Sequence, residues 1–302
     1  MASENDLARG VVVRTCLRDG RGGSPTAVVD EGGSPTSGVA FTDADRRRVP
    51  VGMGTSHAVF VRCAADGVVE LRFFTAEGEL PACGHGTMAA VAFLAARRSG
   101  VEHEFRLRVS GRTFVGRAVR DGDLIHAAFD PGPVAVREAG AVEVGLVADA
   151  LGVAGGGRRV GACVASLGRA RMLVPVGTPE TVWALSPDSR RLRAVCDRLG
   201  LLGCYVYAVP SGSGPVVARM FAPSIGVVED IANVNSTACL AARLAGAGEV
   251  GLTVDMGDAV GEPATITASV RQGVGGSRVL VGGMVTVVRG GVGAPGAGAV
   301  PD

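Results

Sequence analysis

The sequence predicts an α+β protein built from two similar halves that face one cleft. Two segments carry this prediction, over residues 71–96 and 219–245. Each begins as a strand with an Arg-x-Phe pattern, passes through a short acidic stretch and enters a run of small apolar residues that is typical of a buried helix. Elsewhere short apolar runs alternate with turn residues, which indicates many strands and few other helices.

The length of 302 residues suits one large or two medium domains. We expect a first domain over residues 1–130 and a second over residues 131–290, with the last strands able to cross back to the first domain. Pro131-Gly132-Pro133 marks the boundary. Residues 291–302 are rich in Gly, Ala and Pro, so we expect a disordered tail there.

The elements follow from apolar runs and the turn residues between them. In the first half, strands are expected at 11–13, 27–29, 58–61, 68–74, 105–109, 113–117 and 124–129. Thr42 should cap a short helix that Pro50 ends, and the first central helix should cover 88–96. In the second half, strands are expected at 160–167, 170–176, 204–209, 216–221, 251–255, 264–270 and 278–288, with helices near 144–151, 187–199 and 240–245.

Composition excludes several classes of function. The net charge is +1, so the chain lacks the basic surface that nucleic acids or membranes attract. No apolar run is long enough to span a bilayer, and the N-terminus has no signal-type core. Lysine is absent, which excludes a pyridoxal-phosphate Schiff base and a phosphate-binding P-loop. Seven scattered cysteines suggest reduced thiols and a cytoplasmic protein.

The two helix starts are the candidate functional site. Cys83-Gly84-His85-Gly86-Thr87 should present unpaired backbone N–H groups to a small anion. The glycines let a ligand approach the backbone, and His85 can titrate beside it. Asp230 and the stretch Asn235-Ser236-Thr237 form the second helix start.

A metal site is not expected. Cys83 and His85 are close in sequence, but no second pair of residues has the spacing of metal ligands. We expect no other cofactor, since the glycine runs lack the strand-glycine-helix order of a dinucleotide site.

These motifs resemble the PhzF-like family of phenazine-biosynthesis isomerases. The similarity covers nearly the whole chain and lies in Gly22-Gly23-Ser24-Pro25-Thr26-Ala27, Arg72-x-Phe74-Thr75, Glu79-Leu80-Pro81-x-Cys83-Gly84-His85-Gly86-Thr87, Met220-Phe221-Ala222-Pro223, Glu229-Asp230 and Val281-Gly282-Gly283. The resemblance implies a diaminopimelate-epimerase-like fold, in which each domain is a curved, mostly antiparallel sheet or barrel around a central helix. It also implies cofactor-independent proton transfer at carbon and a homodimer.

The chain departs from the family at the residue that moves the proton. The family has a glutamate where this chain has His57, in Ser56-His57-Ala58. Histidine has an ordinary pKa near 6.5, so His57 can both take and return a proton. By the resemblance the catalytic residues are His57, His85 and Asp230. The substrate-binding residues are Ser56, Gly84, Gly86, Thr87, Asn235, Ser236 and Thr237.

Further departures concern the substrate. Val234 stands where the family has glycine, and Asn235 where it has serine. The family's own substrate is therefore not expected here. Cys83 resembles one thiol of a two-thiol racemase, but no cysteine lies near Asp230 to be the second, so a packing role is favoured.

The resemblance predicts an isomerase that moves a proton and a double bond on a small, carboxylate-bearing, amino-acid-derived intermediate of specialised, antibiotic-type metabolism. Two alternatives stay open. One is an epimerase or racemase of a small amino or hydroxy acid. The other is a homologue that binds a small acid without catalysis.

Overall fold

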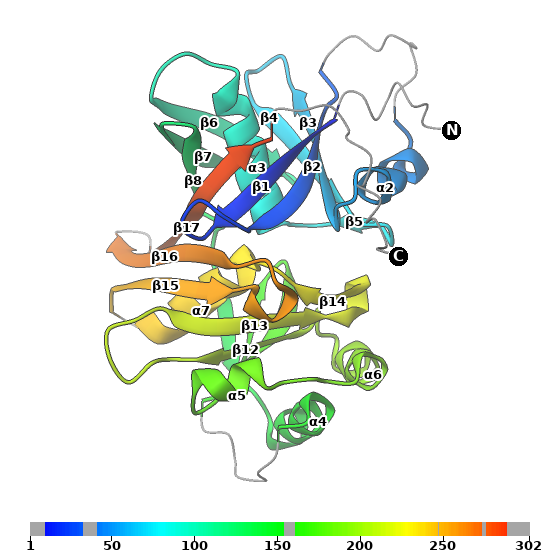
Figure 1. Ribbon diagram of the computed structural model, residues 1–302, viewed down its shortest axis with the longest axis vertical. Coiled ribbons are helices and arrows are strands. Elements are labelled where there is room, and N and C mark those ends of the chain that lie inside the picture. The colour runs from blue at the N-terminus through cyan, green and yellow to red at the C-terminus, as the bar shows by residue number, and fades with distance from the viewer. Residues whose placement is uncertain (1–9, 33–40, 154–160, 247, 274–275, 289–302) are drawn as a thin grey trace, which may run out of the picture.

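The computed structural model describes residues 10–32, 41–153, 161–246, 248–273 and 276–288. It shows two halves, one above the other in Figure 1, each made of strands around one central helix. The predicted tail at residues 291–302 lies outside the described residues. The domain limits at 130 and 290 stay predictions.

The first half is a closed barrel within the described residues. Its strands are β1 (Gly10–Leu17), β2 (Ser24–Asp30), β3 (His57–Cys63), β4 (Val69–Phe74), β6 (Glu102–Val109), β7 (Arg112–Asp121), β8 (Leu124–Phe129) and β17 (Gly276–Val287). Neighbours pair in that order, and β17 closes the ring by pairing with both β8 and β1. Helix α3 (Gly84–Ala96) packs inside it.

The second half repeats the same pairing pattern. Its strands are β10 (Cys163–Leu167), β11 (Arg169–Pro175), β12 (Cys204–Ala208), β13 (Val216–Ala222), β15 (Val250–Met256) and β16 (Ala264–Gly273), followed by β17. Strands β1 to β8 and β10 to β17 show the same alternation: antiparallel, parallel, antiparallel, parallel, antiparallel, antiparallel. Helix α7 (Val234–Ala245) takes the place of α3. The predicted α+β class with two similar halves is confirmed.

Peripheral elements complete each half. Helix α2 (Asp43–Gly52) connects β2 to β3, and α5 (Pro179–Trp183) and α6 (Ser189–Leu199) connect β11 to β12. Such crossovers are required because both connections join parallel strands. Strand β9 (Ala135–Glu138) pairs with β10 and precedes α4 (Ala141–Leu151). No helix in the described part of the chain combines the length and the apolar character needed to cross a membrane.

The sequence of α3 explains its central position. Eleven of its residues are buried, and almost all are small or apolar. A helix that is apolar on every side has no face for solvent, so it belongs in a core. The barrel of the first half supplies that core.

One sequence-based expectation about α2 is wrong. The sequence predicts that Pro50 ends this helix, but the helix continues through Pro50 to Gly52. A proline removes one backbone donor and disfavours the helix interior. Here it falls in the last turn, where Met53 N–H still donates to the carbonyl of Val49 at 3.0 Å.

A repeated clamp holds the segment that leads into each central helix. In the first half Arg72 pairs with Glu79 of β5 (Glu79–Leu80) at 2.6 Å and lies 5.0 Å from the ring centroid of Phe74. In the second half Arg219 pairs with Glu229 of β14 (Val227–Asp230) at 2.6 Å. Its guanidinium lies 4.9 Å from the ring of Phe221. The Arg-x-Phe pattern in the sequence therefore corresponds to one structural device used twice.

The two helix N-termini meet so closely that position 84 has to be glycine. A Cβ atom added at Gly84 would lie 2.5 Å from Cβ of Val234 and 2.9 Å from Oδ1 of Asn235. A methyl group cannot occupy that space unless α7 moves away.

We therefore expect Gly84→Ala to lower the free energy of unfolding by about 1–3 kcal/mol, the usual cost of overpacking. In a Val234→Gly background the same change should cost less, because the atom it meets is gone. Urea unfolding of the four proteins in this double-mutant cycle measures the coupling. Gly145→Ala is the control: nothing lies within 4 Å of its added methyl group, so it should be neutral or stabilising. Equal costs of Gly84→Ala in both backgrounds would contradict the contact.

Candidate active site

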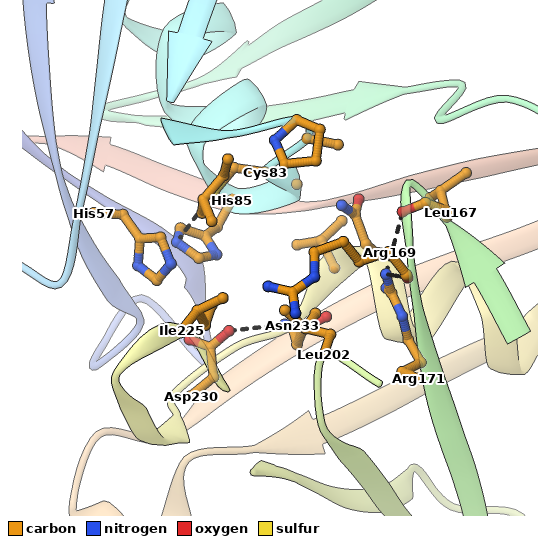
Figure 2. Close-up of a pocket in the computed structure, with 16 residues that line it drawn as sticks. His57, Cys83, His85, Leu167, Arg169, Arg171, Leu202, Ile225, Asp230 and Asn233 are labelled. Carbon is orange, nitrogen blue, oxygen red and sulfur yellow. Dashed lines mark hydrogen bonds between the residues drawn. The ribbon is translucent and has the colours of Figure 1, made fainter. Parts of the chain in front are cut away.

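A small cavity of about 40 Å³ lies where the two halves meet, between the N-termini of α3 and α7. Figure 2 shows its lining with His57, Cys83 and His85 on one side and Asp230 on the other. Residues from both halves therefore contribute to one site.

His57 is the first residue of β3, and its side chain is buried. Its Nδ1 lies 2.8 Å from Oγ of Ser56. With Nδ1–H donating to that hydroxyl, Nε2 carries the lone pair, which is the state a base requires.

His85 lies beside His57. The two ring centroids are 4.3 Å apart, and the rings are nearly perpendicular at 86°. Nε2 of His85 lies 3.5 Å from Sγ of Cys83, the N-cap residue of α3. The thiol for which the sequence favoured a packing role therefore contacts a candidate catalytic group.

Asp230 reaches the cavity from the end of β14 and is also buried. Its Oδ2 accepts a hydrogen bond from Nδ2 of Asn233 at 2.9 Å. Asn233 itself caps α7, since its Oδ1 accepts from the backbone N–H of Ser236 at 2.9 Å. Asn233, and not Asp230, is therefore the N-cap of α7.

The two helix N-termini differ in what they offer an anion. Helix α7 has its side-chain cap, whereas α3 has none: Cys83 makes no capping hydrogen bond. The first-turn N–H groups of a helix need partners from outside it. The start of α3 is thus the more available site for a carboxylate or an enolate oxygen.

The environment drives the pKa values of the two histidines apart. Burial, and then the charge of His85, lower the pKa of His57 well below its ordinary value. Burial also disfavours the charged form of His85, but Cys83, Asp230 and a backbone hydrogen bond to Ala232 outweigh it and raise its pKa to about 9. Burial raises the pKa of Asp230, and His85 and Asn233 partly offset this. Neutral His57 beside a protonated His85 is a base next to an acid.

One group of described residues has the composition of a metal site. The Cys83 thiol and one ring nitrogen each from His57 and His85 lie within 4.8 Å of one another. Two nitrogens and one sulfur are ligands that Zn²⁺ accepts, and a metal would compete with protons for the same lone pairs. Spacing along the chain could not reveal this group, because His57 comes from a separate strand. The absence of a metal stays a prediction.

The predicted site residues divide into two sets. Those that line the cavity are His57, Gly84, His85, Asp230 and Asn235. Those outside its lining are Ser56, Gly86, Thr87, Ser236 and Thr237. In the second set, Thr87 Oγ1 donates to the carbonyl of Cys83 at 2.8 Å, and Thr237 Oγ1 lies 2.9 Å from the hydroxyl of Tyr205.

Two charged residues of the cavity are absent from the predicted set. Arg169 and Arg171 line the cavity from the start of β11. A signal was present, because two arginines alternate in a strand whose other residues are apolar, and alternate residues share one face.

A second cavity of about 270 Å³ adjoins the first. It is lined by several aromatic and proline side chains, including Phe73, Phe114 and Phe129. The residues that line both cavities are Pro81, Ala82, Cys83, Leu167 and Asn235. A ligand can thus place a polar group in the first cavity and apolar atoms in the second.

Relatives of known sequence are described as isomerases. An uncharacterized isomerase of Deinococcus radiodurans is 28% identical over 285 residues, which cover 90% of each chain. An uncharacterized isomerase of Escherichia coli K12 is 26% identical over 222 residues, covering 69% of this chain and 73% of the relative.

Solved structures share the fold. A PhzF-family phenazine biosynthesis protein of Bacillus anthracis has a TM-score of 0.75 at 15% identity, covering 93% of this chain and 96% of the other. A predicted epimerase of Pseudomonas aeruginosa has a TM-score of 0.75 at 24% identity, covering 93% and 97%. A hydroxyproline epimerase of Agrobacterium vitis has a TM-score of 0.58 at 13% identity, covering 92% and 90%. The predicted diaminopimelate-epimerase-like fold is confirmed by this group of neighbours.

A family model gives the broadest match. The model for phenazine biosynthesis-like proteins matches residues 19–291, which is most of the chain. The family suggested by the sequence motifs is thereby confirmed, and the chain belongs to the phenazine biosynthesis-like (PhzC-PhzF) family.

Proposed function

We propose that this protein is a cofactor-independent isomerase that moves a proton, and with it a double bond, on a small carboxylate-bearing molecule. His57 acts as the acid and base in place of the family's glutamate. One observation carries the proposal: two buried histidines 4.3 Å apart face a buried aspartate across a cavity between two helix N-termini.

The proton path begins at His57. Its lowered pKa keeps the imidazole neutral, and Ser56 holds Nδ1, so Nε2 takes a proton from an activated carbon of the substrate. The imidazolium that forms lies beside His85, whose own charge opposes it. This repulsion favours return of the proton, and delivery to a different carbon on the same face moves the double bond.

The start of α3 stabilises the other product of that step. Removal of a proton next to a carboxylate or carbonyl places negative charge on oxygen. Backbone N–H groups at Gly84 to Gly86 and the protonated ring of His85 supply donors and positive charge for that oxygen. Asp230 stabilises the positive charge on His85, so it acts as a positioning residue.

The remaining parts of the proposal rest on the family resemblance. The substrate is an amino-acid-derived intermediate of specialised metabolism, and the protein is a cytoplasmic homodimer. The relatives are named uncharacterized isomerases, which supports the reaction class.

We expect His57→Ala to reduce proton exchange into the substrate by about 10²-fold or more, the usual contribution of a general base. Solvent-deuterium NMR on a panel of unsaturated amino acids measures the exchange for wild type and variant. His57→Glu should retain part of the activity, since it restores the family's residue type. His126→Ala is the matched control, because His126 on β8 does not line the cavity.

The same experiment separates the alternatives. If His57→Ala exchanges protons into the substrate at the wild-type rate, the proposed role of His57 is contradicted. Deuterium at a stereocentre without migration of a double bond would instead indicate an epimerase. Binding of a small acid without any exchange would indicate the non-catalytic homologue.

The opposed pKa values can be checked without a substrate. In ¹⁵N-detected NMR titrations with EDTA present, His85 should lose its proton as the pH rises through about 9. His57 should stay neutral until the pH falls well below its ordinary pKa of 6.5. The chain has four histidines, so the signals can be assigned by substitution.

Cys83→Ser should move the His85 midpoint to lower pH, because the thiol raises the pKa of that ring. The midpoint of His126, which burial lowers, should not move. A His85 that titrates at its ordinary value in the wild type would show that the pair is not polarised in this way.

A further inference from the structure

Arg171 places a positive charge in the interior at the edge of the catalytic cavity. The residue is 1% exposed, and no carboxylate of the described residues forms an ion pair with it. Its Nη2 donates to the backbone carbonyls of Leu167 at 3.1 Å and Arg169 at 2.6 Å. Its Nε has no hydrogen-bond partner. Burying a charge without a counter-ion is unfavourable, so the folded chain keeps a cation that it does not neutralise.

The groups around Arg171 do not remove this imbalance. Its Nη1 lies 3.5 Å from Oγ of Ser236, in the first turn of α7, where the helix dipole is also positive. Cys239 is a titratable neighbour on the same helix, and burial raises its pKa, so it stays an uncharged thiol. Arg169 is a further neighbour of Arg171, and it is a second cation.

Arg169 lies on the same face of β11 as Arg171, two residues before it. Figure 2 shows its side chain extending into the cavity toward the side of Asp230. In the ranges that the structure describes, Arg169 has no ion-pair partner either. The start of β11 thus places two guanidinium groups that have no carboxylate partner in the lining of one cavity.

We propose that Arg169 and Arg171 form an anion subsite that binds a second acidic group of the substrate, a carboxylate or a phosphate. Guanidinium groups bind both anions through paired N–H donors, and Nε of Arg171 is one such donor without a partner. The reacting carboxylate or enolate would lie at the start of α3. The substrate class is therefore a dianion; this part rests on the proposed function, whereas anion binding by the two arginines does not.

Calorimetry with small probes tests the subsite. Malonate and succinate are each compared with the corresponding monoamide, which has nearly the same size and one charge fewer. Wild type should bind a dianion about tenfold or more tightly than its monoamide, as expected for hydrogen bonds to a charged group. Arg171→Met should abolish that preference, Arg171→Lys should restore part of it, and Arg169→Gln should weaken it.

The controls keep the result interpretable. Arg169 is exposed, so Arg169→Gln tests the subsite even if Arg171→Met fails to fold. Arg47→Met removes an exposed arginine of α2 outside the cavity and should leave the preference unchanged. Inorganic phosphate is titrated in parallel: tighter arginine-dependent binding of phosphate than of either dianion supports the subsite and identifies a phosphate group as its ligand.

Two results would overturn the proposal: binding of none of these anions by the wild type, or an unchanged dianion preference in Arg169→Gln and folded Arg171→Met. His57→Ala separates the subsite from the proposed reaction. If the dianion preference persists in that variant while proton exchange is lost, both proposals hold. If exchange also persists, the reaction assignment fails and the subsite stands. If exchange needs His57 but the arginine variants keep the preference, only the subsite fails.

Discussion

The meeting of two helix N-termini at one buried cavity is the constraint on which the rest of the site depends. Both helix starts carry positive potential, and α3 and α7 approach so closely that Gly84 has no room for a methyl group beside Val234. A charged group at this cavity is removed from water. Each ionisable side chain there therefore needs an opposite charge from the protein, a shifted pKa, or an opposite charge from a ligand. The shifts of His57, His85 and Asp230 are the consequence.

The repeated scaffold explains how two similar halves of one chain place different functional groups at the same cavity. Both halves use the same order of strand pairs and the same clamp of arginine, glutamate and phenylalanine before the central helix. The helix starts then diverge. The first has no side-chain cap and carries Cys83 and His85, whereas the second is closed by Asn233 and carries Asp230. In the proposed mechanism the first half thus provides anion-binding N–H groups and proton carriers, and the second provides the balancing carboxylate.

Much of the fold was predictable from the sequence because its signals are local. The Arg-x-Phe strands, the apolar central helix and the alternating strands each depend on neighbouring residues, and most lie where they were expected. Strands β5, β9 and β14 and helix α5 were missed, since elements this short have little periodicity. The site was only partly predictable. His57, His85 and Asp230 were identified through motifs, but the contact of Cys83 with His85 and the cavity position of Arg171 depend on how distant segments pack.

The proposed replacement of the family's glutamate by His57 would have an electrostatic consequence that links the two proposals. A carboxylate at this position would add a negative charge close to His85 and would offset part of the positive charge in the cavity. Neutral His57 adds none. Among the described residues that line the cavity, Asp230 is then the one carboxylate that faces protonated His85, Arg169 and Arg171, and burial raises its pKa. An anionic substrate then supplies the negative charge that a glutamate at position 57 would have provided. A site with a glutamate base would repel a second acidic group, whereas a site with a histidine base can accept one.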